Sequence, residues 1–379
     1  MIKLSRLLAG AASVAAAATL VAGTVTTASA TPNDPPKGVT PAYYDLVGVG
    51  SNTTQYVMDQ LTLGFNATVK VHNPSHPKVY TFDAVKPGTT STTPTNITPK
   101  AGCKVMVRPN GSSAGITALN TTQVIKVNGK FYPCVNYARS SRARKSTDPK
   151  AAVGGIEFVA FARDAISWAV RSPAKGGSDA PKTLNLGQLK KIFTCADKNW
   201  DQVGGKNAAI KVYLPQAGSG TLSTWETFMG ITTLGSCVSQ APEENEGTFA
   251  GFNSPNAIFI YSVGAYVAQK YHSAACGKAP KKGQNEFGCN TTGVLVPMPI
   301  LGVQPLSSGK VPTINPKFPS NFWRTVYNVV NYTAGTPNHM TTSLNAIFGR
   351  TGYMCTNAAA KTQIRDYGFV TTGLCGSVS

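Results

Sequence analysis

The sequence is poor in acidic residues and in histidine, and both shortages narrow the range of possible functions. It holds 16 Asp and Glu against 35 Lys and Arg, with four His among 379 residues. The resulting net charge of +19 favours an anionic partner. No Cys-x-x-Cys occurs, and only His272, four residues before Cys276, lies near a cysteine at ligand spacing. We therefore expect no metal and no other cofactor.

The chain also lacks a basic segment interleaved with aromatic residues. Its basic residues are dispersed, and the one dense cluster, residues 139–145, contains no aromatic side chain. Sequence-independent binding of single-stranded nucleic acid combines positive charge with stacking aromatic rings. We therefore expect no nucleic-acid partner and interpret the charge as suited to solubility or to adhesion to an anionic surface.

Only one long uncharged apolar run is present, and it lies at the start of the chain. Lys3 and Arg6 precede the alanine-rich run 7–21. The segment Ala28-Ser29-Ala30 is typical of a cleavage site. The run is too short for a membrane-spanning helix. The sequence predicts a signal peptide over residues 1–30, cleaved after Ala30. We expect a secreted protein, free or associated with the cell surface, with no stable membrane insertion and no N-terminal lipid anchor.

The mature chain keeps all eight cysteines, an even number. In an exported protein this favours four disulfides. The sequence leaves their pairing open, and pairing of neighbours in chain order is the simplest hypothesis. The cysteines are Cys103, Cys134, Cys195, Cys237, Cys276, Cys289, Cys355 and Cys375.

Short β-branched runs alternate with amphipathic ones, which indicates an α/β fold. Hydrophobic residues make up 42% of the chain, enough for real cores, and the length suggests about two domains. The pattern predicts strands at residues 46–50, 103–107, 156–170, 210–214 and 257–261. It predicts helices at residues 51–61, from 116 onward, and at 184–193, 222–229, 262–271 and 321–331.

Four turns of similar chemistry follow predicted strands. The clearest is the Gly-Ser-Gly-Thr segment 218–221, which lies between a strand and a helix. Such a turn directs free backbone N–H groups and hydroxyls at one point, and the helix dipole adds positive potential there. The other three are residues 48–54, 111–115 and 137–142. In open α/β sheets these turns meet at the carboxyl ends of the strands, so together they predict a site for one small oxyanion.

These motifs make the chain similar to the phosphate-binding component of bacterial phosphate ABC transporters, a family of type II solute-binding proteins. The resemblance rests on the four turns and on the Leu-x-x-x-Gln-Leu-x-x-Ile-Phe helix at 184–193 followed by Asn199-Trp200. It implies two lobes with mixed sheets flanked by helices and joined by a two-strand hinge, with residues 31–157 plus 298–379 in lobe I and 158–297 in lobe II. It also implies a monomer that captures a small inorganic or esterified oxyanion, with an ABC transporter permease as its partner. The ligand-binding residues would be Ser51, Asn52, Thr53, Ser112, Ser113, Arg139, Ser140, Ser141, Ser219, Gly220 and Thr221.

Two positions depart from the family pattern. Ser141 stands where the family has an Asp that accepts the proton of bound phosphate, and Pro215 stands where it has an Arg. Loss of both together is coherent, because one alone would leave a buried unpaired charge. Arg108, Arg139 or Arg142 could restore positive charge, and Glu243, Glu244 or Glu246 could approach as an acceptor. A site with donors only would prefer a fully deprotonated oxyanion, so sulfate, a phosphate ester and a cell-wall phosphodiester stay open beside phosphate.

Two alternatives belong to other functional classes. Residues 111–115 fit Gly-x-Ser-x-Gly, the nucleophile elbow of serine hydrolases, with Ser113 as nucleophile and His272 or His339 as base. An intervening Asp197 or Asp201 would complete a triad. This pattern is short and arises often by chance, so we expect a binding protein and no enzyme. The second alternative is a surface-adherent binder of anionic cell-wall polymer.

Overall fold

The structure, a computed structural model, describes residues 34–36 and 38–379. The predicted signal peptide and its cleavage after Ala30 lie outside the described residues. Within the described part, no helix is both long and apolar enough to cross a membrane.

A mixed sheet organises the molecule. Its strands lie in the order β10-β9-β11-β8-β13-β7-β1-β2, and β12 and β14 add to β8. The bounds are β1 (Leu46–Gly50), β2 (Val79–Thr81), β7 (Tyr137–Ser140), β8 (Ile156–Arg171), β9 (Lys211–Tyr213), β10 (Val238–Ser239), β11 (Ala257–Ser262), β12 (Leu295–Pro297), β13 (Trp323–Asn331) and β14 (Val370–Thr371). Two small hairpin-like pairs lie apart from it, β3 (Asn96–Ile97) with β4 (Met106–Val107), and β5 (Val124–Val127) with β6 (Lys130–Pro133).

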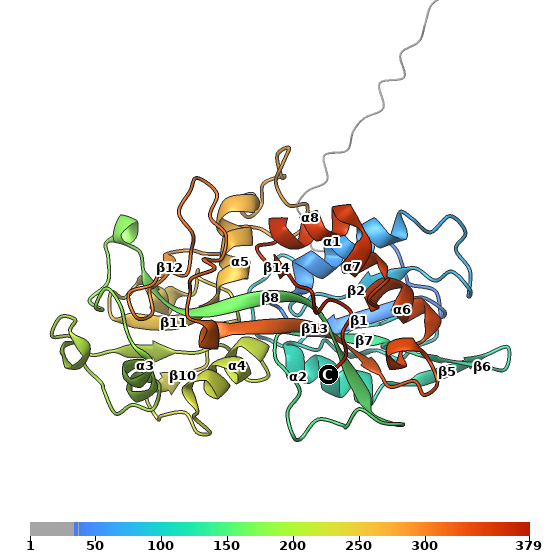
Figure 1. The fold of residues 1–379 in the computed structure, drawn as a ribbon, viewed down its shortest axis with the longest axis horizontal. Helices are drawn as coiled ribbons and strands as arrows, with labels where there is room; N and C mark the ends of the chain where they lie inside the picture. Colours follow the sequence, from blue (N-terminus) through green and yellow to red (C-terminus); the bar gives the residue numbers. More distant parts are fainter. Residues whose placement is uncertain (1–33, 37) are drawn as a thin grey trace, which may run out of the picture.

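Two antiparallel strands, β8 and β13, run between the two halves of the molecule (Figure 1). One end of β8 pairs with β13 beside β7, and its other end pairs with β11 and β12. One lobe forms around β1, β2 and β7, and the other around β9, β10 and β11. The large core of this second lobe includes Trp168, Trp200 and Trp225, all fully buried. Residues 300, 314 and 322 pack into the same core. The fold is therefore a two-lobed α/β structure with two connecting strands.

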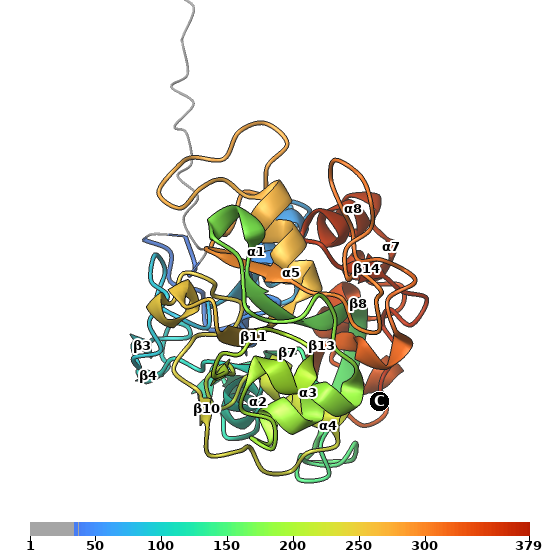
Figure 2. The ribbon, with the colours of Figure 1, turned by 90° about the vertical axis from the view of Figure 1, so that its left-hand side faces the viewer.

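Helices cover both lobes. They are α1 (Gln55–Asn66), α2 (Ser112–Asn120), α3 (Leu186–Phe193), α4 (Gly220–Met229), α5 (Val263–Val267), α6 (Thr342–Phe348), α7 (Tyr353–Thr356) and α8 (Ala358–Asp366). In the second lobe, α3 and α4 lie on one side of β11 and α5 lies on the other (Figure 2). The Asn185 side chain caps α3 and the Gln188 side chain caps the Asn185 N–H in return, so the predicted helix at 184–193 begins two residues later than expected.

Most of the predicted elements are present, but the helix predicted at 321–331 is wrong. That segment is strand β13, preceded by a short 3₁₀ turn at Ser320–Phe322. Buried and half-buried residues alternate along its first half, and it carries Thr325, Val326, Val329 and Val330. β-branched side chains and a period of two favour a strand, and these signals outweigh the helical spacing that the prediction used.

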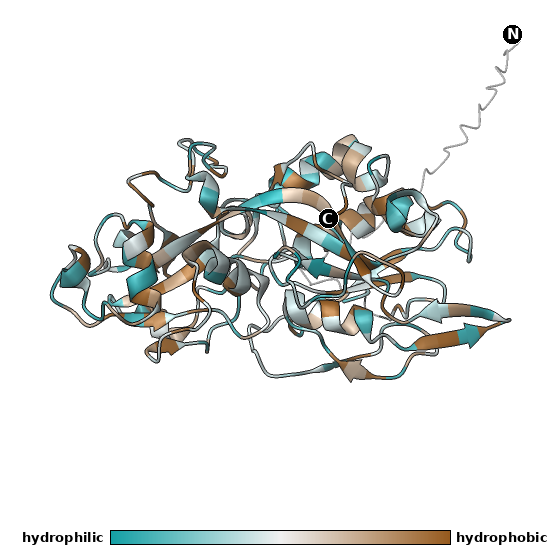
Figure 3. Cartoon of the chain, turned by 60° about the horizontal axis from the view of Figure 1, so that its bottom comes forward, coloured by the Kyte–Doolittle hydropathy of each residue, from teal (hydrophilic) through white to brown (hydrophobic). Residues whose placement is uncertain are grey.

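Smaller differences concern element ends. Of the predicted strand at 103–107, only Met106–Val107 pairs, and the first helix begins at Gln55 with Thr54 before it, not at Ser51. The β5–β6 hairpin projects from the first lobe with hydrophobic colouring along it (Figure 3), and Val124 and Phe131 are exposed there. The eight cysteines pair in chain order, as 103–134, 195–237, 276–289 and 355–375.

Candidate functional site

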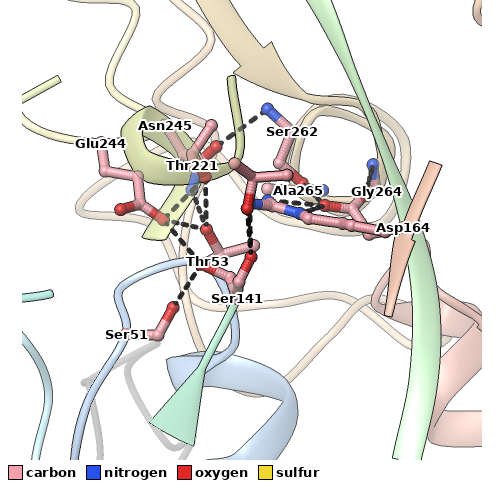
Figure 4. A network of polar contacts seen from close by, with 12 residues as sticks. Ser51, Thr53, Ser141, Asp164, Thr221, Glu244, Asn245, Ser262, Gly264 and Ala265 are labelled. Carbon is pink, nitrogen blue, oxygen red and sulfur yellow. Dashed lines mark hydrogen bonds and ion pairs between the residues drawn. The ribbon is translucent and has the colours of Figure 1, made fainter. Parts of the chain in front are cut away.

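Hydroxyls from all four turns meet at one place, which we call the hydroxyl cluster: Ser51, Thr53, Ser112, Ser141 and Thr221. The hydroxyl of Ser51 donates to that of Ser141 at 3.0 Å, and the hydroxyls of Thr53 and Thr221 are 3.1 Å apart (Figure 4). Ser112 joins through its Oγ, which accepts the backbone N–H of Ser141 at 3.0 Å. All five side chains are buried, although they come from segments up to 170 residues apart.

Helix ends explain why these hydroxyls converge. Thr53 lies just before α1, Ser112 opens α2 and Thr221 lies in the first turn of α4. Strand β1, which precedes α1, and strand β9, which precedes α4, run in opposite directions and point toward each other from the two lobes. The N-terminal ends of three helices therefore contribute partial positive charge to the same small volume. This arrangement stabilises negative charge without a cationic side chain.

Gly220 allows the two lobes to approach at the cluster. A Cβ built on Gly220 would overlap the hydroxyl oxygens of Ser112 and Ser141. Both of these serines belong to the first lobe, whereas Gly220 opens a helix of the second. Only glycine therefore fits at position 220 as long as the hydroxyls of Ser112 and Ser141 keep their positions.

The carboxylate of Glu244 lies inside the cluster. Its Oε1 accepts hydrogen bonds from the hydroxyls of Thr221, at 3.0 Å, and Thr53, and lies 3.5 Å from that of Ser141 (Figure 4). Glu244 is 1% exposed, and its Oε2 has no hydrogen-bond partner within the described residues. Of the three glutamates that the sequence left open as an acceptor, Glu244 therefore lies in the cluster.

The loop that carries Glu244 is fastened to both lobes. The Glu244 N–H donates to Oε1 of Gln216 at 2.8 Å, and the Glu243 carboxylate accepts from the amides of Gln216, at 2.7 Å, and Asn110, at 2.8 Å. Asn245 accepts the N–H of Ser262 at 3.1 Å and donates to Thr53 at 3.1 Å. These contacts, one of which is to the cluster hydroxyl of Thr53, hold the loop and so position Glu244.

Burial shifts the titration of the neighbouring carboxyl groups. Desolvation raises the pKa of Glu243 to about 8, and the hydrogen bonds from Asn110 and Gln216 only partly oppose it. Desolvation also raises the pKa of Glu246, against hydrogen bonds from Thr248. Both groups therefore hold protons to a higher pH than exposed glutamates do.

Some predicted residues lie beside the cluster rather than in it. Ser219 caps α4, because its Oγ accepts the N–H of Leu222 at 3.1 Å. The Ser113 hydroxyl accepts from Arg142 at 3.2 Å, and the Ser140 hydroxyl donates to the Arg142 carbonyl at 2.8 Å. Asn52 contacts the site indirectly, because its Oδ1 accepts a hydrogen bond from Nδ2 of Asn245 at 3.4 Å. These positions support the site's framework.

The three arginines suggested as replacement charges have other partners. Arg108 forms an ion pair with Asp34, and Arg142 forms one with Asp148 at 2.6 Å. Arg139 is fully buried and donates to the carbonyls of Ser51, at 3.1 Å, and Gly50, at 3.2 Å, and to the Thr81 hydroxyl. Arg139 therefore stabilises the backbone of the first turn. Its guanidinium adds positive potential near the hydroxyl cluster, although it contacts none of the five cluster hydroxyls.

A buried ion pair on the connecting strands supports the third turn. Arg324 on β13 stands opposite Asp164 on β8, and its Nη2 lies 2.7 Å from the Asp164 carboxylate. Arg324 also donates to the Ser141 carbonyl at 2.9 Å, and Asp164 accepts the N–H of Gly264 and the Ser262 hydroxyl (Figure 4). The strands that join the lobes therefore also orient Ser141.

Sequence reasoning named Glu244 only as one of three candidates and did not identify Gln216, Asn110 or Asn245 as its supports. One signal was available. Glu243, Glu244 and Glu246 are three of the chain's 16 acidic residues and lie within four positions. Such a concentration in an acid-poor chain marks the loop, but the sequence does not show which of the three faces the cluster.

A model of the PBP superfamily domain matches residues 35–316, most of the chain. The protein belongs to the PBP superfamily. No curated protein sequence matches it. As a PBP superfamily member, it carries the candidate site between its lobes, at the ends of strands from both.

Three solved structures resemble this chain at low sequence identity. An ABC-type phosphate transport receptor from Vibrio cholerae is 16% identical, with a TM-score of 0.51 over 86% of this chain and 100% of that one. A putative phosphate ABC transporter substrate-binding protein with bound phosphate from Clostridium perfringens is 16% identical, with a TM-score of 0.48 over 86% and 99%. A human phosphate binding apolipoprotein is 13% identical, with a TM-score of 0.46 over 86% and 91%. The first of these shares the two-lobed fold.

Proposed function

We propose that this protein is an exported solute-binding protein that captures a small oxyanion, phosphate, in the hydroxyl cluster between its lobes. The observation that carries the proposal is the position of the Glu244 carboxylate. A carboxylate is itself an oxyanion, and the hydroxyls of Thr53 and Thr221 donate to it. The donors are therefore already directed at a negatively charged oxygen, in a volume that three helix ends make favourable for anions.

Glu244 also supports a protonated oxyanion over sulfate. When an oxyanion takes the hydroxyls, the buried carboxylate beside it repels a second negative charge. The P–OH group of a hydrogen phosphate ion can donate a hydrogen bond to Glu244, whereas sulfate carries no such donor at neutral pH. An acceptor left without a donor in a buried site costs free energy. The geometry therefore favours phosphate among the oxyanions that the sequence left open.

Calorimetric titration of the purified protein with phosphate and with sulfate tests this function. We expect saturable binding of phosphate, a higher melting temperature in its presence, and weaker binding of sulfate. No heat and no thermal shift with any oxyanion would contradict the proposal.

The wider biological role rests on the fold. We place residues 31–157 in lobe I and 158–297 in lobe II. Of the segment 298–379, which the sequence assigned to lobe I, residues 300, 314 and 322 pack into the core of lobe II, and the part from 326 onward packs in lobe I. We propose β8 and β13 as the hinge on which the lobes close. Delivery of the ligand to an ABC transporter permease is the role that the architecture supports, with free scavenging as the alternative. Pull-down of a permease by ligand-loaded protein, compared with ligand-free protein, separates the two.

The serine hydrolase alternative has weaker support. The Ser113 hydroxyl accepts from Arg142, a cation, and among the described residues neither His272 nor His339 forms a hydrogen bond with it. His339 lies 2.8 Å from Glu157 instead. A nucleophilic serine needs a base within hydrogen-bond reach. Assay of ester hydrolysis by the wild type and by Ser113→Ala tests this alternative, and a rate that depends on Ser113 would favour it.

A further inference from the structure

A cavity adjoins the hydroxyl cluster. It has a volume of about 540 Å³ and shares Asn52, Glu244 and Asn245 with the site described above. Its other walls include the loop at residues 87–90 and the Cys276–Cys289 disulfide. Cavities of 300–1,000 Å³ are typical of sites for organic ligands. The adjoining volume has room for an organic substituent on an ion held by the cluster.

The cavity wall is acidic. Glu243, Glu244 and Glu246 line it, and no Lys, Arg or His of residues 34–36 and 38–379 does. Both oxygens of Glu243 accept amide hydrogen bonds, and one oxygen of Glu246 accepts from Thr248. Glu244 differs, because its Oε2 is buried and has no partner within the described residues. A buried carboxylate oxygen without a donor is costly unless a ligand supplies one.

We propose that the adjoining cavity is a subsite for the cationic substituent of a phosphomonoester. The phosphoryl oxygens would take the hydroxyls of the cluster, and a primary ammonium group on a short carbon chain would reach Glu244 and Glu246. The ammonium would donate to the unpartnered Oε2 and would offset the repulsion between Glu244 and the phosphoryl group. This inference rests on the proposed function, since it assumes that the cluster holds the phosphoryl group.

A subsite for a cationic group should bind esters according to the charge of their substituent, whereas a cavity without specificity should bind esters of similar size equally. Calorimetry should compare inorganic phosphate with three esters of similar size: phosphoethanolamine, glycerol 3-phosphate and phosphoglycolate, whose substituents are cationic, neutral and anionic. We expect phosphoethanolamine to bind at least tenfold more tightly than phosphoglycolate, with glycerol 3-phosphate between them. Glu246→Gln should reduce the preference for phosphoethanolamine severalfold, while Thr121→Val, an exposed position elsewhere, should leave it unchanged.

The outcomes distinguish this inference from the proposed function. Binding of inorganic phosphate with no binding of any ester would overturn the subsite and leave the proposed function standing. Equal affinity for the cationic and anionic esters would also overturn it. Absence of binding by inorganic phosphate and by all three esters would contradict both. If Glu246→Gln fails to fold, the order of affinities among the three esters in the wild type decides alone.

Discussion

The hydroxyl of Thr221 donates a hydrogen bond to the carboxylate of Glu244 at 3.0 Å, in a site where both residues are almost fully buried. Thr221 belongs to the Gly-Ser-Gly-Thr turn, and Glu244 belongs to an acidic loop 23 residues further along the chain. Thr53, from the other lobe, donates to the same carboxylate oxygen. One acceptor thus joins the two lobes at the point where their helix ends meet.

Glu244 should set the choice between oxyanions. Glu244→Gln removes the acceptor and its negative charge, so we expect phosphate to bind at least tenfold more weakly relative to sulfate than in the wild type. Competition between the two ions, followed by calorimetry, measures this ratio. Glu226→Gln, on α4 outside the cluster, is the matched control and should leave the ratio unchanged. An unchanged ratio in Glu244→Gln would show that Glu244 does not select the ligand.

Ser219 and Thr221 should separate into a structural and a binding residue. Ser219→Ala removes the cap of α4 and should lower the free energy of unfolding by about 1 kcal/mol. Thr221→Val keeps the shape but removes a cluster donor, so it should weaken phosphate binding at least tenfold with a smaller effect on stability. Urea unfolding and calorimetry on both variants measure the two effects. The reverse pattern would mean that the turn's serine, not its threonine, faces the ligand.

Gly220 should tolerate no side chain. In Gly220→Ala the new methyl group overlaps the hydroxyl oxygens of Ser112 and Ser141, so we expect loss of phosphate binding and a lower melting temperature. Gly373→Ala is the matched control, because its Cβ would meet nothing within 4 Å. Thermal melts and phosphate titration test both. Normal binding by Gly220→Ala would show that the lobes need not approach this closely.

The Asp164–Arg324 pair should be important for stability. Arg324→Met leaves a buried carboxylate without its partner, and such losses cost about 3–5 kcal/mol. It also removes a donor from the Ser141 carbonyl, so any folded variant should bind phosphate more weakly. Arg350→Met, whose guanidinium is at the exposed surface, is the control. A destabilisation no larger than that of the control would contradict this role.

Stability should fall as the pH rises from about 5 to 8. Burial raises the pKa of Glu243 from 4.5 to about 8 and that of Asp83 from 3.8 to about 7. The folded protein therefore binds these protons more tightly than the unfolded chain, and it loses that stabilisation progressively as the pH rises from the ordinary pKa values through the raised ones. Melting temperatures across this range should decrease, and less steeply in Glu243→Gln. A flat or rising profile in the wild type would contradict the prediction.

Local patterns predicted much of the fold. Strands at β1, β8, β9 and β11 follow from short β-branched runs, and helices α3 and α4 follow from amphipathic spacing and caps. The prediction failed at β13, where Trp323 to Asn331 has spacing compatible with a helix but forms the second connecting strand. That outcome depends on pairing with β8, more than 150 residues earlier, which no local pattern records.

The candidate site was also predicted only in part. The hydroxyls of Thr53, Ser112, Ser141 and Thr221 were predicted because each belongs to a turn with a recognisable residue pattern. Glu244 lies in a loop without regular structure, and its position depends on contacts with Gln216 and Asn110 from distant segments. The roles of Arg108 and Arg142 could not be predicted either, because their ion-pair partners Asp34 and Asp148 are set by the fold.

The most direct test of the central claim is the phosphate affinity of the double variant Thr53→Val, Thr221→Val beside that of the wild type. These two residues contribute one hydroxyl from each lobe, and valine keeps their shape. The account predicts saturable phosphate binding by the wild type and a loss of at least a hundredfold in a double variant that melts cooperatively. Equal affinity in the two proteins would contradict it.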